Sequence, residues 1–245
     1  MSTSSRSAPR REKARAATID EIKLTALTHM RETGTVDFRF ADIARAMEMT
    51  PPALYRYFAD RDELLSALIA DAYNDLGRVV AEARDAVPDE DIGARFLAVA
   101  HAYRQWARQE PQQFALILGL PVAGYAAPVD GPTTEAAQRA MSQLSSLFVQ
   151  AIERGVLGPP RLRDVHPVIA ECAAQKNEHL ATAIPPETFQ AMLHTWSTLH
   201  GFAALEAYGH FDWIDEAGRD ALFDGHARLA AEVAGIPAPN TARHD

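Results

Sequence analysis

The chain has 245 residues, 47% of them hydrophobic and 23% charged, which is the composition of an ordinary globular protein with one large or two small domains. Its only cysteine, Cys172, excludes an intrachain disulfide and a zinc site built from thiolates. No apolar run reaches the roughly 18 residues of a membrane span and none follows the Ser- and Arg-rich start as in a secretory signal, so a cytoplasmic chain is expected.

The net charge of −9 is unevenly distributed along the chain. Residues 1–15 carry a net charge of +4 from one acid, Glu12, and five bases, Arg6, Arg10, Arg11, Lys13 and Arg15. A basic start on an acidic body fits a small DNA-contacting end on a larger domain. We expect residues 1–15 to form a flexible basic N-terminal tail. Its arginines either reach toward a neighbouring groove of DNA or belong to a solvated, disordered leader.

Helical periodicity dominates the sequence, and no alternating pattern indicates a strand. Four helices are expected first, over about residues 16–33, 40–47, 51–58 and 60–85. Gly34 ends the first of these helices, and Asp60 caps the fourth. Since the fourth is long for a three-helix domain, we expect it to join residues 16–62, a DNA-binding domain, to the next domain.

Six further helices are expected downstream, over about residues 91–109, 111–119, 133–155, 165–183, 186–209 and 215–234. Pro88 breaks the chain before them, and the Gly- and Pro-rich stretch 119–132 is expected to be a loop. The fold class is therefore all-α. We expect residues 88–235 to form a larger helical effector and dimerisation domain, followed by a frayed tail over residues 236–245.

The second and third helices, joined by a tight turn, describe a helix-turn-helix. On the third helix, Leu54 and Phe58 define the buried side. The residues that point away from that side or flank it are Pro52, Ala53, Tyr55, Arg56 and Tyr57. An arginine can donate two hydrogen bonds to guanine, an alanine can contact a thymine methyl, and tyrosine hydroxyls can donate to phosphates. The bland alternatives are a solvated Arg56 and tyrosines that act as partly buried supports.

The two prolines of this helix have no N–H group, which limits how its first turn can be capped. Thr50 is a suitable N-cap, and because neither Pro51 nor Pro52 can donate, we expect its hydroxyl to cap Ala53. The start of the helix also offers few N–H groups to a phosphate. Anchoring on phosphates should therefore fall to side chains.

The segment FADIARAMEMTPPALYRYFADRDELLSAL resembles the TetR family of bacterial transcription regulators. Two downstream segments, AYRQWARQEPQQFALILG and WSTLHGFAALEAYGHF, resemble a TetR effector domain marked by a Trp-x3-His-Gly motif, here Trp196, His200 and Gly201. The resemblance implies that the third helix enters the major groove and that Arg61 contacts a phosphate. It also implies a C-terminal domain that dimerises and holds a small ligand. For Arg61, a surface ion pair with Asp62 or Glu63 is the alternative.

The sequence departs from the family pattern at two places. Glu48 replaces the glycine that is usual in the turn, and a left-handed glutamate costs about 1 kcal/mol. The second helix lacks a Ser or Thr cap, so we expect Asp37 to cap it and Arg39 to bind a phosphate by charge.

A ligand pocket in the larger domain would need apolar walls and few polar groups. The candidates for its lining are Tyr103, Trp106, Phe114, Tyr125, Met141, Phe148, Trp196 and His200. The aromatic members also fit an ordinary core, and His200 fits a core histidine with its hydrogen bonds satisfied. Small and apolar residues on the last two helices suggest a dimer interface that includes Gly201, Ala204, Leu222 and Leu229, although tight packing within one subunit would explain them too.

Other classes of protein are less well supported by the motifs. The sequence contains no nucleophile elbow, no zinc-protease motif, no phosphate loop and no dinucleotide fingerprint, so no enzyme, metal or cofactor is predicted. A helical small-molecule carrier or interaction protein would explain the larger domain but leaves the Arg/Tyr face unexplained. We expect a ligand-responsive transcriptional regulator, in the first instance a repressor, that binds a palindromic operator as a homodimer and is released by a small lipophilic effector.

Overall fold

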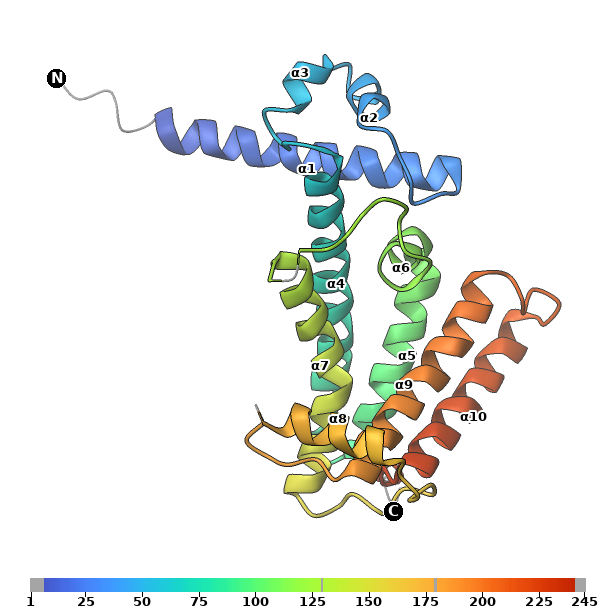
Figure 1. The fold of residues 1–245 in the computed structure, drawn as a ribbon. Coiled ribbons are helices and arrows are strands. Elements are labelled where there is room, and N and C mark those ends of the chain that lie inside the picture. Colours follow the sequence, from blue (N-terminus) through green and yellow to red (C-terminus); the bar gives the residue numbers. More distant parts are fainter. Residues whose placement is uncertain (1–6, 129, 179, 241–245) are drawn as a thin grey trace. The chain divides into compact units, whose positions relative to one another are not determined.

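The computed structural model describes residues 7–128, 130–178 and 180–240, and every regular element within these residues is an α-helix (Figure 1). The all-α prediction is confirmed. The helices are α1 (Ser7–Thr33), α2 (Phe40–Ala46), α3 (Pro51–Leu54), α4 (Arg61–Asp85), α5 (Ile92–Gln109), α6 (Pro111–Leu118), α7 (Pro132–Glu153), α8 (Pro167–Asn177), α9 (Pro186–Ala207) and α10 (Glu216–Ala234). None of the described helices is long and apolar enough to cross a membrane.

The chain forms two compact units. Unit 1 contains the described residues up to Asn74 together with Glu110–Ala137, and unit 2 contains Asp75–Gln109 together with the described residues from Gln138 onward. This division differs from the expected linear one, because α6 and the loop after it group with the helix-turn-helix.

Two hydrogen bonds within unit 1 explain why α6 and its loop belong there. The Tyr73 hydroxyl of α4 donates to the Ile117 carbonyl at 3.0 Å, and the hydroxyls of Ser66 and Tyr125 lie 2.9 Å apart. Helix α6 also packs against α1. These are tertiary contacts between distant segments, which periodicity along the chain does not report.

The core of unit 1 is formed by the apolar stripe of α1 and by residues of α2, α3 and α4. The stripe of α1 has the four-residue spacing of a helical face, and its members Ile22, Ala26 and Met30 are fully buried. Leu54 and Leu65 are equally buried opposite it. The start of α4 is capped as expected: Asp60 accepts a hydrogen bond from the Glu63 N–H at 2.8 Å, and Glu63 in turn accepts one from the Ala59 N–H.

Helix α1 begins at Ser7, well before the expected residue 16. Residues 7–15, expected in a flexible tail, are therefore helical, while residues 1–6 lie outside the described part. At the C-terminal end, a frayed tail was expected from residue 236, but residues 236–240 are packed. Ile236 is buried, and the Asn240 N–H donates to the Asp91 carboxylate at 2.9 Å. Residues 236–240 therefore pack against the rest of unit 2, and residues 241–245 are not described.

Unit 2 packs α5, α9 and α10 together, with α8 against α9. Its largest fully buried side chains include Phe96, Phe148 and Phe223. Helices α4 and α7 approach closely at Gly77, because a Cβ there would lie 3.3 Å from the Cα of Ala140. This close approach positions two of the helices that border the cavity described below.

Candidate nucleic-acid interface and cavity

The turn between α2 and α3 adopts the left-handed conformation that the sequence suggested. Glu48 has φ 54°, and it is the only non-glycine residue with positive φ in the described chain. Its N–H donates to the Arg45 carbonyl at 3.0 Å, and the Met49 N–H donates to the Ala44 carbonyl at 2.9 Å. The turn thus closes α2 with the geometry for which glycine is usual, at the strain expected for an L residue.

The expected cap of α2 is wrong. The N-cap position is occupied by Arg39, which makes no capping hydrogen bond with its side chain. The carboxylate of Asp37 lies 2.5 Å from the Arg61 guanidinium instead. The Asp37 carboxylate forms a strong, charge-assisted contact with Arg61 of α4 and therefore does not cap α2.

The expected cap of α3 is also wrong. Thr50 occupies the N-cap position, but its hydroxyl makes no capping hydrogen bond, and the Ala53 N–H donates to the Thr50 carbonyl at 2.8 Å. The helix ends at Leu54, four residues before the expected end, and the chain continues as a turn in which the Tyr57 N–H donates to the Leu54 carbonyl at 2.9 Å. Two prolines without N–H groups leave so short a helix few backbone hydrogen bonds of its own.

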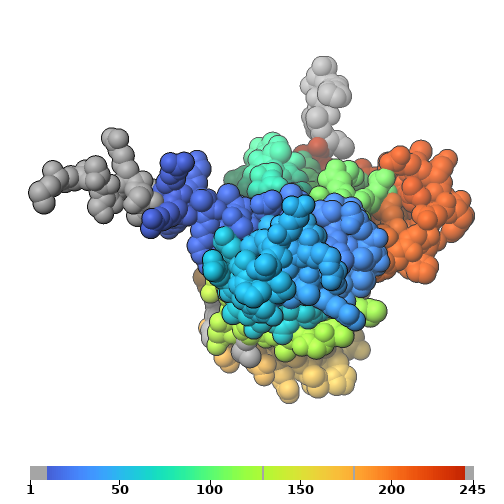
Figure 2. Space-filling view, turned by 90° about the horizontal axis from the view of Figure 1, so that it is seen from above, coloured from blue at the N-terminus to red at the C-terminus, as the bar shows by residue number. Residues whose placement is uncertain are grey.

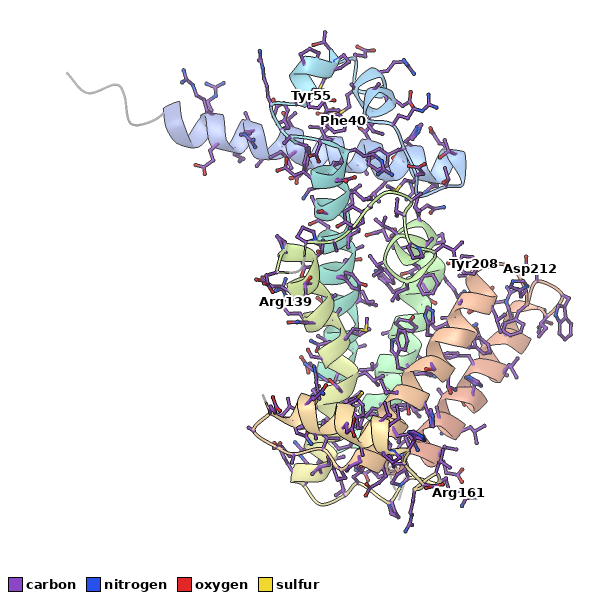
Figure 3. The ribbon with its side chains drawn as sticks, viewed as in Figure 1. Phe40, Tyr55, Arg139, Arg161, Tyr208 and Asp212 are labelled. Carbon is purple, nitrogen blue, oxygen red and sulfur yellow. The ribbon has the colours of Figure 1, made fainter. Side chains whose placement is uncertain are left out.

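The exposed face of this segment agrees with the helical wheel. Leu54 and Phe58 are buried, as expected. The expected DNA-contacting residues that are exposed are Arg39, Thr50, Pro52, Tyr55 and Arg56, whereas Ala53 and Tyr57 are half-buried. The Tyr55 ring lies 4.9 Å from the Phe40 ring, which braces it against α2 (Figure 3).

Arg61 is engaged within unit 1. In addition to Asp37, it contacts Asp62 at 3.2 Å, donates to the Phe38 carbonyl at 3.0 Å and lies over the Phe38 ring. These contacts tie the start of α4 to the segment before α2. The arrangement gives Arg61 a positioning role, and its expected contact with phosphate stays a prediction.

Unit 2 contains a small apolar cavity that is partly open to solvent. Its lining is mostly aliphatic and contains no charged side chain: Leu76, Val80, Val99, Ala100, Tyr103, Ala140, Met141, Gln143, Leu144, Trp196 and Leu199. A cavity of this kind suits an uncharged, mainly apolar molecule.

Of the eight expected pocket residues, the structure brings Tyr103, Met141 and Trp196 together in this lining. The others lie elsewhere. Trp106 and Phe148 are buried in unit 2, and the Trp106 indole donates to Asp75 at 2.8 Å. Phe114 and Tyr125 belong to unit 1. His200 is next to the cavity, without being part of its lining. The aliphatic members were missed because their helical spacing is the same as that of core residues.

Three polar groups are linked at one side of the cavity. The Tyr103 hydroxyl lies 2.9 Å from His200 Nδ1, and the His200 ring is stacked on Trp196 with centroids 5.1 Å apart. Burial lowers the pKa of His200 from its ordinary value. The Trp196 Nε1–H is buried and has no hydrogen-bond partner within the described chain. A buried donor without a partner is costly.

Several apolar side chains are exposed on α9 and α10. The expected interface residues Gly201 and Ala204 are half-buried, and Leu222 and Leu229 are exposed. Leu193, Leu205, Tyr208 and Val233 are exposed on the same two helices or at the end of α9. A Cβ placed on Gly201 would meet nothing within 4 Å in the described chain. Apolar side chains exposed on two helices that pack against each other are candidates for an interaction surface.

Comparison with protein families gives two matches that together span most of the chain. Residues 25–68 match the model of bacterial regulatory proteins of the tetR family, and residues 96–229 match that of the tetracyclin repressor-like C-terminal domain. The chain belongs to the TetR family. The first match covers α2, α3 and the turn at Glu48, where the exposed Arg/Tyr face lies.

Among curated relatives of this TetR-family chain is the HTH-type transcriptional regulator Rv1816 of Mycobacterium tuberculosis. It is 32% identical over 206 residues, which cover 82% of this chain and 85% of the relative. A second relative from the same organism, the HTH-type transcriptional regulator Rv0681, is 28% identical over 212 residues, or 84% of this chain and 77% of the relative.

Solved structures show the same fold. The crystal structure of the regulatory protein SCO4313 has a TM-score of 0.68 and 32% identity, and the match covers 90% of this chain and 98% of that one. The TetR-family regulator PfmR from Thermus thermophilus matches with a TM-score of 0.57 at 16% identity, over 86% of this chain and 97% of that one. The fold of this TetR-family chain is thus shared well beyond close sequence similarity.

Proposed function

We propose that this chain represses transcription by binding a palindromic operator as a homodimer, and that a small lipophilic molecule releases it. The observation that carries the proposal is the exposed face around Arg56 in a helix-turn-helix of the TetR family. We assign the protein no catalytic role and no cofactor, and place it in the cytoplasm with the DNA that it reads.

We call the DNA-contacting residues of α3 and the turn after it, Ala53, Tyr55, Arg56 and Tyr57, the reading face. Each of them has a role that follows from its chemistry. Arg56 contacts a base edge, Ala53 a thymine methyl, and Tyr55 and Tyr57 contact phosphates. Arg39 adds a phosphate contact from the N-cap of α2. Thr50 and Pro52 line the exposed start of α3 beside them.

Selection from a random-sequence duplex pool by the full-length protein tests DNA reading. We expect a palindromic motif whose affinity falls steeply with salt, as phosphate contacts require. Failure to bind any duplex at low salt, together with binding of an apolar probe, would favour the alternative of a helical carrier or interaction protein.

For the effector, we propose an uncharged molecule with a hydrogen-bond acceptor, held in the cavity beside Trp196. The cavity has no charged lining residue, and the buried Trp196 N–H has no partner in the described chain. We also propose that Trp196, His200 and Gly201 are the motif of a Trp-x3-His-Gly effector domain. The neutral dye Nile red is a suitable probe, and we expect Ala100→Phe, which fills the cavity, to abolish its binding. Ala174→Phe, on the exposed side of α8, is the matched control.

For release, the effector must bind two states of the protein with unequal affinity. We propose that α4 carries the change, because this single helix contributes residues to both units. We also propose that the apolar surface of α9 and α10, with Gly201, Ala204, Leu222 and Leu229, joins the two subunits. Activation in place of repression would appear as a rise in transcription when the protein is present without effector.

A further inference from the structure

We propose that the first turns of α1 form a basic helical arm that binds the phosphates of double-stranded DNA beside the groove read by α3. The inference rests on the proposed DNA-binding function and extends its surface. The arm is residues 10–15, which belong to a continuous helix that begins at Ser7. In Figures 1 and 2, the first turns of α1 project past α3.

Arg15 fixes the arm to the reading segment. Its guanidinium donates to the Arg56 carbonyl at 3.2 Å and lies over the Tyr57 ring, 5.5 Å from the centroid. The planar arginine group suits both contacts at once, which a lysine ammonium does not. Arg15 therefore links the arm to two residues of the proposed reading face.

Arg11 lies one turn before Arg15 and on the same side of α1. At 100° per residue, both positions continue the stripe of Ile22, Ala26 and Met30 beyond the core. Lys13 lies on the opposite side. Arg11 is exposed, and the described residues offer it no hydrogen bond or ion pair. Its charge is thus available on the side of the arm that Arg15 joins to α3.

The spacing and charge of the arm fit a DNA backbone. Residues one turn apart are about 6 Å apart along the helix axis, and long arginine side chains can reach separate groups from positions at that spacing. Arg11 can therefore contact a different phosphate from those near Tyr57. Residues 10–15 contain four bases and one acid, in a chain whose net charge is −9. The positive charge of the arm favours a polyanion as its partner. Because Arg15 connects the arm to Arg56 and Tyr57, we infer that this partner is the duplex that α3 binds.

The test compares two variants that lose the same charge from opposite sides of the arm, Arg11→Ala and Lys13→Ala. The probe is the duplex selected by the wild-type chain, and the readout is the slope of log K against log salt concentration. We expect Arg11→Ala to reduce the magnitude of this slope by about 0.9 per subunit, since one phosphate contact is lost. Lys13→Ala should leave the slope near the wild-type value. Equal slopes for the two variants would overturn the proposal.

A third variant, Arg15→Lys, keeps the charge but loses the combination of the hydrogen bond to the Arg56 carbonyl and the contact with the Tyr57 ring. We expect it to lose hydroxyl-radical protection of the deoxyriboses that flank the site, as Arg11→Ala does, while the selected sequence motif stays the same. Protection that persists in Arg15→Lys would overturn the role of Arg15. If the wild-type chain binds no duplex at low salt, the proposed function fails as well. If it binds and Arg11→Ala changes nothing, only the arm is wrong.

Discussion

The Tyr103 hydroxyl of α5 lies 2.9 Å from Nδ1 of His200 on α9, and the His200 ring stacks on Trp196 one turn earlier. Two of these three residues line the cavity of unit 2. Because burial lowers the pKa of His200, the neutral ring is favoured. The imidazole that Tyr103 contacts next to the cavity is therefore mainly uncharged at neutral pH.

The lowered pKa of His200 predicts an acid-sensitive fold. Below about pH 6.5, the unfolded chain binds a proton at this histidine and the folded chain does not, so the free energy of unfolding falls as pH drops toward the folded-state pKa. His200→Gln should remove this part of the pH dependence, measured by urea unfolding between about pH 7 and about pH 5. His210→Gln, at an exposed histidine, is the control. A pH dependence that is the same in both variants would contradict the prediction.

Glu48 predicts a simple route to higher stability. Its φ of 54° is strained for an L residue and costs a glycine nothing. Glu48→Gly should therefore raise the free energy of unfolding by about 1 kcal/mol. Since Glu48 is exposed, no buried contact is lost. Glu48→Ala keeps a Cβ at the same backbone angle and should bring no such gain; an equal gain would show that the side chain, and not the backbone, is the source.

The turn at Glu48 also shows what the sequence can predict. Helix periodicity predicted α1, α2 and α4, and the helical wheel predicted the burial of Leu54 and Phe58. The glycine that is usual at position 48 in the family indicated a left-handed backbone at Glu48. These are local relationships, decided by spacing and by backbone sterics. The N-caps of α2 and α3 are local too, yet they were predicted wrongly. Asp37 contacts Arg61, 24 residues away, and that competing partner is not visible in the local pattern.

A variant of Arg56 distinguishes contact with a base from contact with the DNA backbone. Arg56→Ala should relax base preference at one position of each half-site by about 1–3 kcal/mol. Site selection with the variant and the wild-type chain, at one salt concentration, measures this directly. Arg39→Ala is the comparison, because a lost phosphate contact weakens binding to all sequences alike. If the selected motif is unchanged for Arg56→Ala, Arg56 contacts the DNA phosphates and not a base.

Gly201 tests the proposed subunit interface without disturbing the subunit itself. A Cβ there meets nothing within 4 Å in the described chain, so a longer side chain is tolerated unless a second copy covers the site. We expect Gly201→Arg to convert a dimer to a monomer in sedimentation analysis and to weaken operator binding. Ala174→Arg, on the exposed surface of α8, should leave the dimer intact. If the Gly201→Arg protein sediments as a dimer, this surface is not the subunit interface.

Glu206 is the centre of a buried ionic cluster that joins α5, α9 and α10. It accepts two hydrogen bonds from Arg104 at 2.6 Å, and both side chains are only 6% exposed. Glu206→Gln should lower the free energy of unfolding by about 1.5–3 kcal/mol, because Arg104 loses one charged partner but keeps its ion pair with Asp220 at 2.8 Å. Glu216→Gln removes an exposed ion pair with Arg108 and should cost about 0–1 kcal/mol. Comparable losses from the two variants in thermal unfolding would contradict this account.

The cavity marks the limit of sequence reasoning for this chain. Aromatic residues drew attention, but Trp106 donates to Asp75 and Phe148 is fully buried, so both serve the core. The actual walls include Val80 and Ala140, whose spacing is identical to that of core positions. An apolar stripe on a helix packs against a neighbouring helix or lines a cavity, depending on the distance between the helices, as at Gly77. The sequence pattern of a single helix does not specify that distance.

The proline pair at the start of α3 has a thermodynamic consequence for recognition. Pro51 and Pro52 have fixed φ angles, so the reading segment has little conformational freedom to lose when it meets DNA. Binding should then be rigid docking, with a heat-capacity change that reflects the buried surface alone and not the folding of a segment. Four residues of helix are thus enough for the task, because their shape is set before the DNA arrives.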